Sequence, residues 1–161
     1  MKRLFLILSL LLLIGCKSKT GAEKPGDIKR GKEKIVKLAL SEVDENQKKK
    51  AYELGKRVLM TCNTSKFKPF NESEATVSVI KNTTEERLTK TCARFRQYYG
   101  TFKDLQLVEI FKNETEKTTV FRYKALYSKK VANKELRVFM NDENKVSAIK
   151  SLDWVDDFQY Q

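Results

Sequence analysis

Three cysteines and the absence of histidine limit the chemistry that this chain can do. The 161 residues include Cys16, Cys62 and Cys92 but no histidine. Without histidine there is no Ser-His or Cys-His nucleophile pair, and the most frequent side-chain metal ligand is missing. Cys62 and Cys92, with 29 residues between them, match no zinc-ligand spacing, and no glycine-rich phosphate-binding motif is present. We therefore expect no metal, no cofactor and no catalytic residue.

The first sixteen residues predict an export signal. A basic start precedes an apolar stretch from Leu4 to Ile14, which ends in Gly15 and Cys16. The stretch is shorter than the roughly 20 residues that a transmembrane helix needs, and its pattern is typical of a signal peptide. Residues 13–16, LIGC, resemble the lipobox of bacterial lipoproteins. That resemblance implies removal of residues 1–15 and acylation of Cys16 with diacylglycerol and a fatty acid such as palmitate.

This resemblance predicts a lipid-anchored protein of the bacterial cell envelope, with membrane lipid as its first partner. The alternatives are an ordinary signal with a chance cysteine, or an uncleaved short anchor. Residues 16–40 are predicted to be a linker, because residues 17–34 hold almost no apolar side chain and carry seven basic and three acidic residues, a net charge of +4. No acidic run follows Cys16, which favours a periplasm-facing position.

Cys62 and Cys92 are expected to form a disulfide in such an oxidising compartment. Helical spacing places Cys62 on one face with Val58 and places Cys92 on another face with Leu88 and Phe95. Both sulfurs therefore belong to core-facing stripes. A bridge would close a loop of about 30 residues and stabilise the fold by roughly 3 to 4 kcal/mol. The alternative is two unbonded thiols that behave as small buried hydrophobes.

The length and charge predict one folded domain, residues 41–161, behind the linker. The whole chain has a formal charge of +12, and loss of Lys2 and Arg3 with the signal lowers it to +10. A lipid-anchored envelope protein rarely meets nucleic acid, so we expect no nucleic-acid partner. Anionic lipid, cell-wall polymer or acidic glycan are the expected charged neighbours.

Helical periodicity dominates the first half of the domain. A helix is predicted from a Ser41 cap through residue 62. Residues 73–82 favour a short helix, although β-branched residues also suit a strand. A third helix is predicted over residues 85–99, with Thr84 as its N-terminal cap and Gly100 at its C-terminal end.

Beyond Gly100 the period changes to that of β-strands. Four strands are predicted, within residues 105–113, 118–130, 134–141 and 145–155, joined by short turns. In the second strand Phe121 and Tyr123 point to one face, and Val120 and Arg122 point to the other. The sequence therefore predicts an α+β fold in which two to three N-terminal helices pack on a C-terminal four-stranded antiparallel meander.

Residues 41–154 resemble small lipoprotein domains of the nuclear transport factor 2-like, or cone, class. The resemblance rests on a helix ending in Tyr99-Gly100, the strand LQLVEIFKN and long strands that finish near a tryptophan. It implies helices packed on a curved sheet with a concave binding face. The cone class often places a strand or hairpin between its early helices, and only residues 74–81 can supply it here. A cystatin-like helix on a meander therefore stays open as the alternative.

Aromatic residues are the candidate lining of a binding pocket between sheet and helices. The five candidates are Tyr98, Tyr99, Tyr123, Tyr127 and Trp154, although such residues more often belong to the core. The expected function is a non-catalytic envelope domain that binds a protein partner or small ligand. The alternatives are a cone-class pocket enzyme that uses Asp, Glu and Tyr groups, and a cystatin-like inhibitory or structural module.

Overall fold

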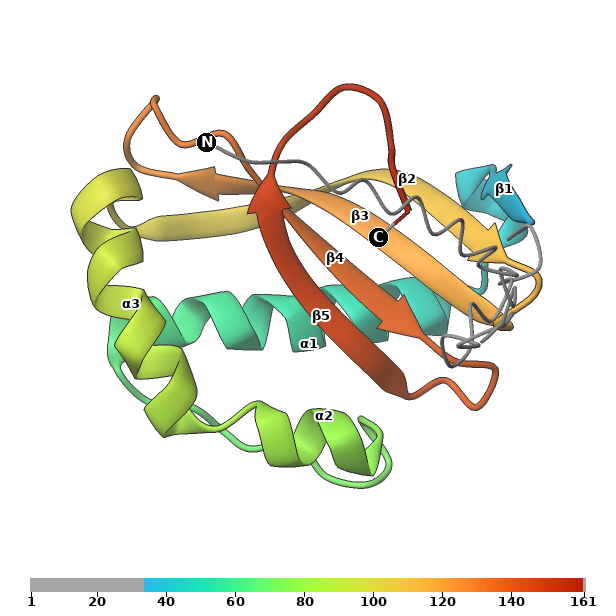
Figure 1. Ribbon diagram of the computed structural model, residues 1–161, viewed down its shortest axis with the longest axis horizontal. Helices are drawn as coiled ribbons and strands as arrows, with labels where there is room; N and C mark the ends of the chain where they lie inside the picture. The colour runs from blue at the N-terminus through green and yellow to red at the C-terminus, as the bar shows by residue number, and fades with distance from the viewer. Residues whose placement is uncertain (1–33, 161) are drawn as a thin grey trace, which may run out of the picture. The chain divides into compact units, whose positions relative to one another are not determined.

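The computed structural model describes residues 34–160 and has the predicted α+β class (Figure 1). The predicted signal peptide (residues 1–15), Cys16 and most of the linker lie outside the described residues. The elements follow one another as β1 (Ile35–Leu38), α1 (Glu45–Thr64), α2 (Val77–Asn82), α3 (Glu85–Tyr99), β2 (Phe102–Asn113), β3 (Thr118–Tyr127), β4 (Lys134–Met140) and β5 (Val146–Asp153).

The sheet has five antiparallel strands in the order β1-β2-β3-β4-β5, so the prediction of four strands was wrong. The added strand, β1, runs from Ile35, opposite Asn113, to Leu38, opposite Ile110. The predicted linker, residues 16–40, therefore overlaps the fold at residues 35–38. Four residues are too few for their alternation to predict a strand. The strand β1 forms because it pairs with β2, which lies more than 70 positions later in the chain.

Helix α1 begins later than predicted. Asp44 is its N-terminal cap, and the Asp44 Oδ1 atom accepts a hydrogen bond of 2.9 Å from the backbone N–H of Gln47. Ser41, the predicted cap, lies in a short 3-10 turn over Leu40–Glu42. Val43, between the turn and the cap, is extended and buried. The helix therefore starts only after Val43 has entered the core, and Asp44 is a favoured cap residue at that point.

The two later helices follow their local signals. In α3 the Thr84 hydroxyl accepts a hydrogen bond from the Arg87 N–H, and Gly100 ends the helix with a φ of 79°. Both predicted caps are confirmed. The ambiguous segment is a helix from Val77, as favoured, while Ala75 just before it forms a bridge to Val146 of β5.

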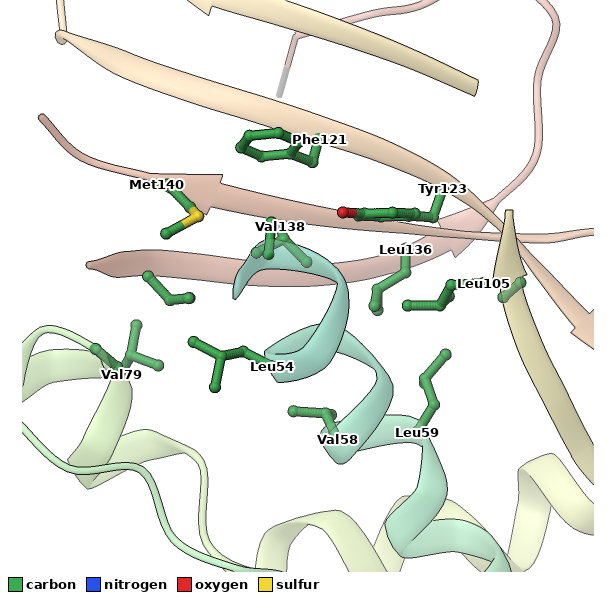
Figure 2. Close-up of a cluster of buried hydrophobic side chains, with 14 of the residues drawn as sticks. Leu54, Val58, Leu59, Val79, Leu105, Phe121, Tyr123, Leu136, Val138 and Met140 are labelled. Atoms are coloured by element: carbon green, nitrogen blue, oxygen red, sulfur yellow. The ribbon is translucent and has the colours of Figure 1, made fainter. Parts of the chain in front are cut away.

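The face of the sheet that packs against α1, here called the inner face, holds the main apolar core (Figure 2). Phe121 and Tyr123 lie on it, as the alternation in the sequence predicts, and their side chains are almost fully buried. Gly55 brings α1 very close to β4, since a Cβ atom there would lie 2.9 Å from both Leu136 Cδ2 and Val138 Cγ2. The other members labelled in Figure 2 are Leu54, Val58, Leu59, Val79, Leu105 and Met140.

Within residues 34–160, the opposite, outer face is covered by the C-terminal segment, residues 154–160, and by no helix. Val120, Phe111 and Phe139 form a second apolar cluster there, and Phe158 of the C-terminal segment packs on it. Arg122, on the same face as Val120, is completely buried. Both faces of the sheet are therefore covered, each by a different kind of element.

Candidate binding cleft

Helix α3 packs mainly on α1 and contacts the sheet through Phe95 and Tyr99, whose ring centres lie 6.5 and 5.8 Å from that of Tyr127 on β3. A cleft lies between α3 and the strands β4 and β5. The apolar part of the cleft, here called the inner chamber, is a hollow of about 170 Å³ that is open to solvent on one side. The chamber walls are mainly apolar and come from α1, α3, β4 and β5. The lining residues are Val58, Leu59, Cys62, Leu88, Thr91, Phe95, Leu136, Ile149 and Ser151.

A second hollow, here called the mouth, adjoins the inner chamber and has a volume of about 330 Å³. Thr91, Phe95 and Ser151 line both hollows, so the two are adjacent and are here treated together as the cleft. The mouth adds polar and charged side chains to this shared set. The added residues are Arg94, Tyr98, Tyr99, Lys134 and Asp153.

The cleft changes from apolar to polar along β4, β5 and α3, whereas α1 lines only the apolar part. On β4 the lining passes from Leu136 to Lys134, two residues away on the same face. On β5 it passes from Ile149 through Ser151 to Asp153. On α3 it passes from Leu88 near the start to Arg94 and Tyr98 near the end. The antiparallel register places Lys134 opposite Asp153, so the polar ends of both strands meet at the mouth.

The two cations of the mouth are held differently. The Lys134 ammonium lies 2.7 Å from Asp153 Oδ1 and 5.5 Å from the centres of the Phe95 and Tyr99 rings. Its side chain is only 10% exposed, whereas that of Asp153 is 81% exposed. The Arg94 guanidinium lies 5.9 Å from the Tyr98 ring centre and, among residues 34–160, makes no hydrogen bond or ion pair. Arg94 therefore keeps its hydrogen-bond donors available to a ligand.

A disulfide joins α1 to α3 at the wall of the inner chamber. It links Cys62 to Cys92, whose Cα atoms are 4.7 Å apart. Each cysteine lies on the apolar helix face that the sequence predicts for it. Val58 and Leu59 lie on the same face as Cys62, and Leu88 lies on the same face as Cys92. This bond fixes the middle of α3 to α1, while the side of α3 toward β5 borders the cleft.

The structure brings two of the five candidate aromatic residues into the cleft, Tyr98 and Tyr99. Tyr127 lies just behind them, with its ring centre 5.8 Å from that of Tyr99, and burial raises its pKa to about 12. Tyr123 is a core residue, and burial raises its pKa well above the usual range. Its hydroxyl has no hydrogen-bond partner within the described part of the chain. Trp154 lies on the outer face, 4.0 Å from the Arg122 guanidinium.

The charged residues of the cleft were not among those candidates. Arg94 and Lys134 are two of 33 basic residues in the chain, and nothing local distinguishes them from lysines and arginines that merely face solvent. Leu88 and Phe95 were assigned to the stripe beside Cys92, a signal for burial but not for a cavity. The cleft depends on how far α3 stands from β5, which no single segment encodes.

The cleft offers binding groups rather than an evident catalytic set. Within residues 34–160, no group of three or more Cys, Asp or Glu side chains could hold a metal ion, and no helix is long and apolar enough to cross a membrane. Comparison of the chain with protein-family models, with curated proteins and with solved structures finds no match.

Proposed function

We propose that this protein is a lipid-anchored domain of the bacterial cell envelope that binds a small ligand in the cleft between α3 and β5, without catalysis. The observation that carries the proposal is the continuous change of the cleft lining from Leu136 and Ile149 to Lys134 and Arg94. An apolar pocket with a few convergent polar groups is the usual form of a small-molecule site.

The number of carboxylates lining the described cleft favours a binding role over a pocket enzyme. Such an enzyme needs two or more carboxylates near a reactive group. Asp153 is the one acid lining the described cleft, and it is paired with Lys134. Tyr123, around which the enzyme hypothesis would place the acids, is packed in the core beside Tyr52, with ring centres 6.4 Å apart.

The cone-like arrangement is the form of the α+β fold that we propose, in preference to the cystatin-like one. Three helices accompany the sheet in the described chain, and α2 and α3 both line hollows beside β5. A single helix packed on a meander would leave no such wall. An inhibitory or structural module that docks on a partner protein is the second candidate, and Val131 (72% exposed) and Val77 (57% exposed) are apolar residues available to it.

The anchor is tested by the intact mass of the protein purified from membranes. We expect a chain that lacks residues 1–15 and carries acyl groups on Cys16, and a Cys16→Ser variant that is neither acylated nor retained in the membrane. A full-length mass without acyl groups would overturn the anchor and the envelope location with it.

Ligand binding is tested with the neutral fluorophore N-phenyl-1-naphthylamine and two tryptophan variants. Ser151 lines both chambers from an exposed position on β5, so Ser151→Trp should block the cleft and abolish the fluorescence gain. Gln106→Trp, at an exposed position on β2 that does not line the cleft, is the matched control and should bind like the wild type. Equal fluorescence from both variants would overturn the cleft as the binding site.

A further inference from the structure

We infer that the ligand of this cleft is a small amphiphile, with an anionic head group at the mouth and one apolar group in the inner chamber. This inference rests on the proposed function and names the ligand class of the same site. It combines three observations. They are the size and lining of the inner chamber, the Arg94 guanidinium at the mouth, whose hydrogen-bond donors are unused among residues 34–160, and the unequal exposure of the Lys134–Asp153 pair.

The inner chamber limits the apolar part of the ligand. An enclosed apolar cavity of about 150 Å³ accepts a molecule of the size of benzene, and this volume sets the scale for the hollow here, which is open to solvent on one side. The chamber here has a volume of about 170 Å³ and leucine, isoleucine, valine and phenylalanine walls. It therefore accommodates one aromatic ring or the end of one alkyl chain, and no polar head group.

The mouth determines the charge of the head group. Arg94, Lys134 and Asp153 are the charged residues that line the mouth, so its lining side chains carry a net charge of +1. Arg94 has its donors available, and guanidinium groups bind carboxylate and phosphate oxygens through two parallel hydrogen bonds. A cationic head group would instead meet Arg94 without a compensating acid, because the single carboxylate there is already paired with Lys134.

Lys134 supplies a second contact when the ligand enters. Its ammonium is held in place by the Phe95 and Tyr99 rings, while its partner Asp153 is 81% exposed. The Asp153 carboxylate can turn into water when it leaves Lys134, whereas the Lys134 ammonium is nearly buried and needs an anion beside it, so the anionic head group takes the place of Asp153. Further positive charge lies nearby, since the Lys129 ammonium is 2.7 Å from the carbonyl oxygen of Gln97 near the end of α3.

The test uses four probes that share an octyl chain and differ in the head group, each below its micelle concentration. Octanoate and octyl phosphate are anionic, octyl glucoside is neutral, and octyltrimethylammonium is cationic. Each competes with N-phenyl-1-naphthylamine for the full-length protein. We expect the two anionic probes to bind about 10-fold more tightly than octyl glucoside, as one charge-assisted contact implies, and the cationic probe to bind most weakly.

Variants on one turn of α3 locate the effect. Arg94→Gln should remove most of the anionic preference and leave the affinity for octyl glucoside unchanged. Arg96→Gln changes an exposed arginine two positions away that does not line the cleft, and it should behave like the wild type. An anionic preference that survives in Arg94→Gln would overturn the assignment of the head group to this mouth.

The outcomes separate this inference from the proposed function. Equal binding of octanoate and octyl glucoside, abolished in both cases by Ser151→Trp, would overturn the anionic head group and leave the cleft as a ligand site. Failure of all four probes and of the fluorophore to bind would overturn the proposed function itself. If the inference holds, the affinity ratio of octanoate to octyl phosphate tells whether the head group is closer to a carboxylate or to a phosphate.

Discussion

On its inner face the sheet presents Phe121, Leu136 and Val138, whereas its outer face presents Arg122, Glu135 and Arg137. All six side chains are almost fully buried. The inner face is stabilised by apolar contact with α1. Each large side chain that this contact removes from water contributes about 1.5 to 3 kcal/mol to the free energy of unfolding. The outer face buries charge, which is costly unless every group has a partner.

The charges of the outer face do have partners. Glu135 lies between the two arginines and accepts from the Nε atoms of Arg122, at 2.6 Å, and of Arg137. The Glu109 Oε2 atom accepts a further hydrogen bond of 2.6 Å from Arg122 Nη1. The C-terminal segment supplies the rest, because the carbonyl oxygens of Val155 and Gln159 accept from Arg122 and Arg137 respectively.

Aromatic rings of the same segment complete the cover of the outer face. The Arg122 guanidinium lies 4.0 Å from the Trp154 ring centre, and Arg137 lies 4.6 Å from that of Phe158. Phe158 in turn stacks on Phe111 with centres 3.8 Å apart. The outer face is closed by directional contacts, while the inner face is left open where α3 separates from β5. A ligand site is therefore expected on the inner face.

The largest predicted effect is on the outer face. Glu135→Gln should lower the free energy of unfolding by about 3 to 5 kcal/mol, because it leaves two buried guanidinium groups without their shared carboxylate. Urea denaturation measures this change. Glu143→Gln is the control, since Glu143 pairs with Lys145 with its side chain 68% exposed and should cost at most about 1 kcal/mol. Similar losses in both variants would show that the outer network does not hold that face together.

The next effect concerns the bond between α1 and α3. Cys62→Ser/Cys92→Ser should lower the free energy of unfolding by about 3 to 4 kcal/mol, since the bond closes a loop with a separation of 30 residues. It should also weaken binding of N-phenyl-1-naphthylamine, because α3 is the outer wall of the cleft.

The outer face serves as the internal control for that variant. Trp154 is the only tryptophan of the chain and lies on the outer face, so its native emission should persist where ligand binding is already lost. If the wild-type protein and the double variant unfold at the same urea concentration without reductant, the disulfide does not stabilise the fold and the prediction is contradicted.

A smaller effect distinguishes the tightly packed part of the inner face from its open part. Gly55→Ala should cost about 1 to 2 kcal/mol, because crowding against Leu136 and Val138 outweighs the gain in helix propensity. Thr91→Ala, on the side of α3 that lines the cleft, should change the stability by no more than about 0.5 kcal/mol. Thermal unfolding of both variants measures the difference, and a stabilising Gly55→Ala would contradict the close approach of α1 to β4.

The sequence predicted those parts of the molecule whose signals are local. Thr84 and Gly100 mark the ends of α3 because a cap acts within one turn of its helix. The alternation in β3 assigns Phe121 and Arg122 to opposite faces for the same reason. The strand β1 was missed because its four residues depend on pairing with β2.

The candidate site was less predictable because a cleft is a property of spacing between elements. Tyr98 and Tyr99 were candidates and do line the mouth. Trp154 was one too, but β5 ends at Asp153 and the chain then crosses to the outer face. The position of α3 beside β5 depends on contacts between distant segments, among them the disulfide from Cys92 to Cys62 of α1.

The smallest predicted effect concerns a partly exposed carboxylate beside the inner face, that of Asp104. It tests whether this ion contributes as much to stability as the buried ions of the outer face. Tyr52 and Lys56 of α1 both donate to the Asp104 Oδ1 atom, at 2.7 and 2.9 Å. These two hydrogen bonds, that of Tyr52 first, lower the pKa of Asp104 from 3.8 to about 2. The ionised carboxylate is therefore favoured by folding, and its small contribution to stability is present above pH 3.8 and is lost as the pH falls through about 2.

Titration of the Asp104 carboxyl carbon by NMR should give a midpoint of about 2 in the wild type. Tyr52→Phe should raise that midpoint toward 3.8 by removing the phenol donor, and Lys56→Gln should raise it by a smaller amount. Neither variant should approach the instability of Glu135→Gln, since the Asp104 side chain is 47% exposed and water solvates the carboxylate when its partners are removed. A midpoint that stays at about 2 in Tyr52→Phe would show that the phenol does not hold the proton off Asp104. In that case the Lys56 ammonium, rather than the Tyr52 phenol, would be the donor that keeps the Asp104 carboxyl ionised.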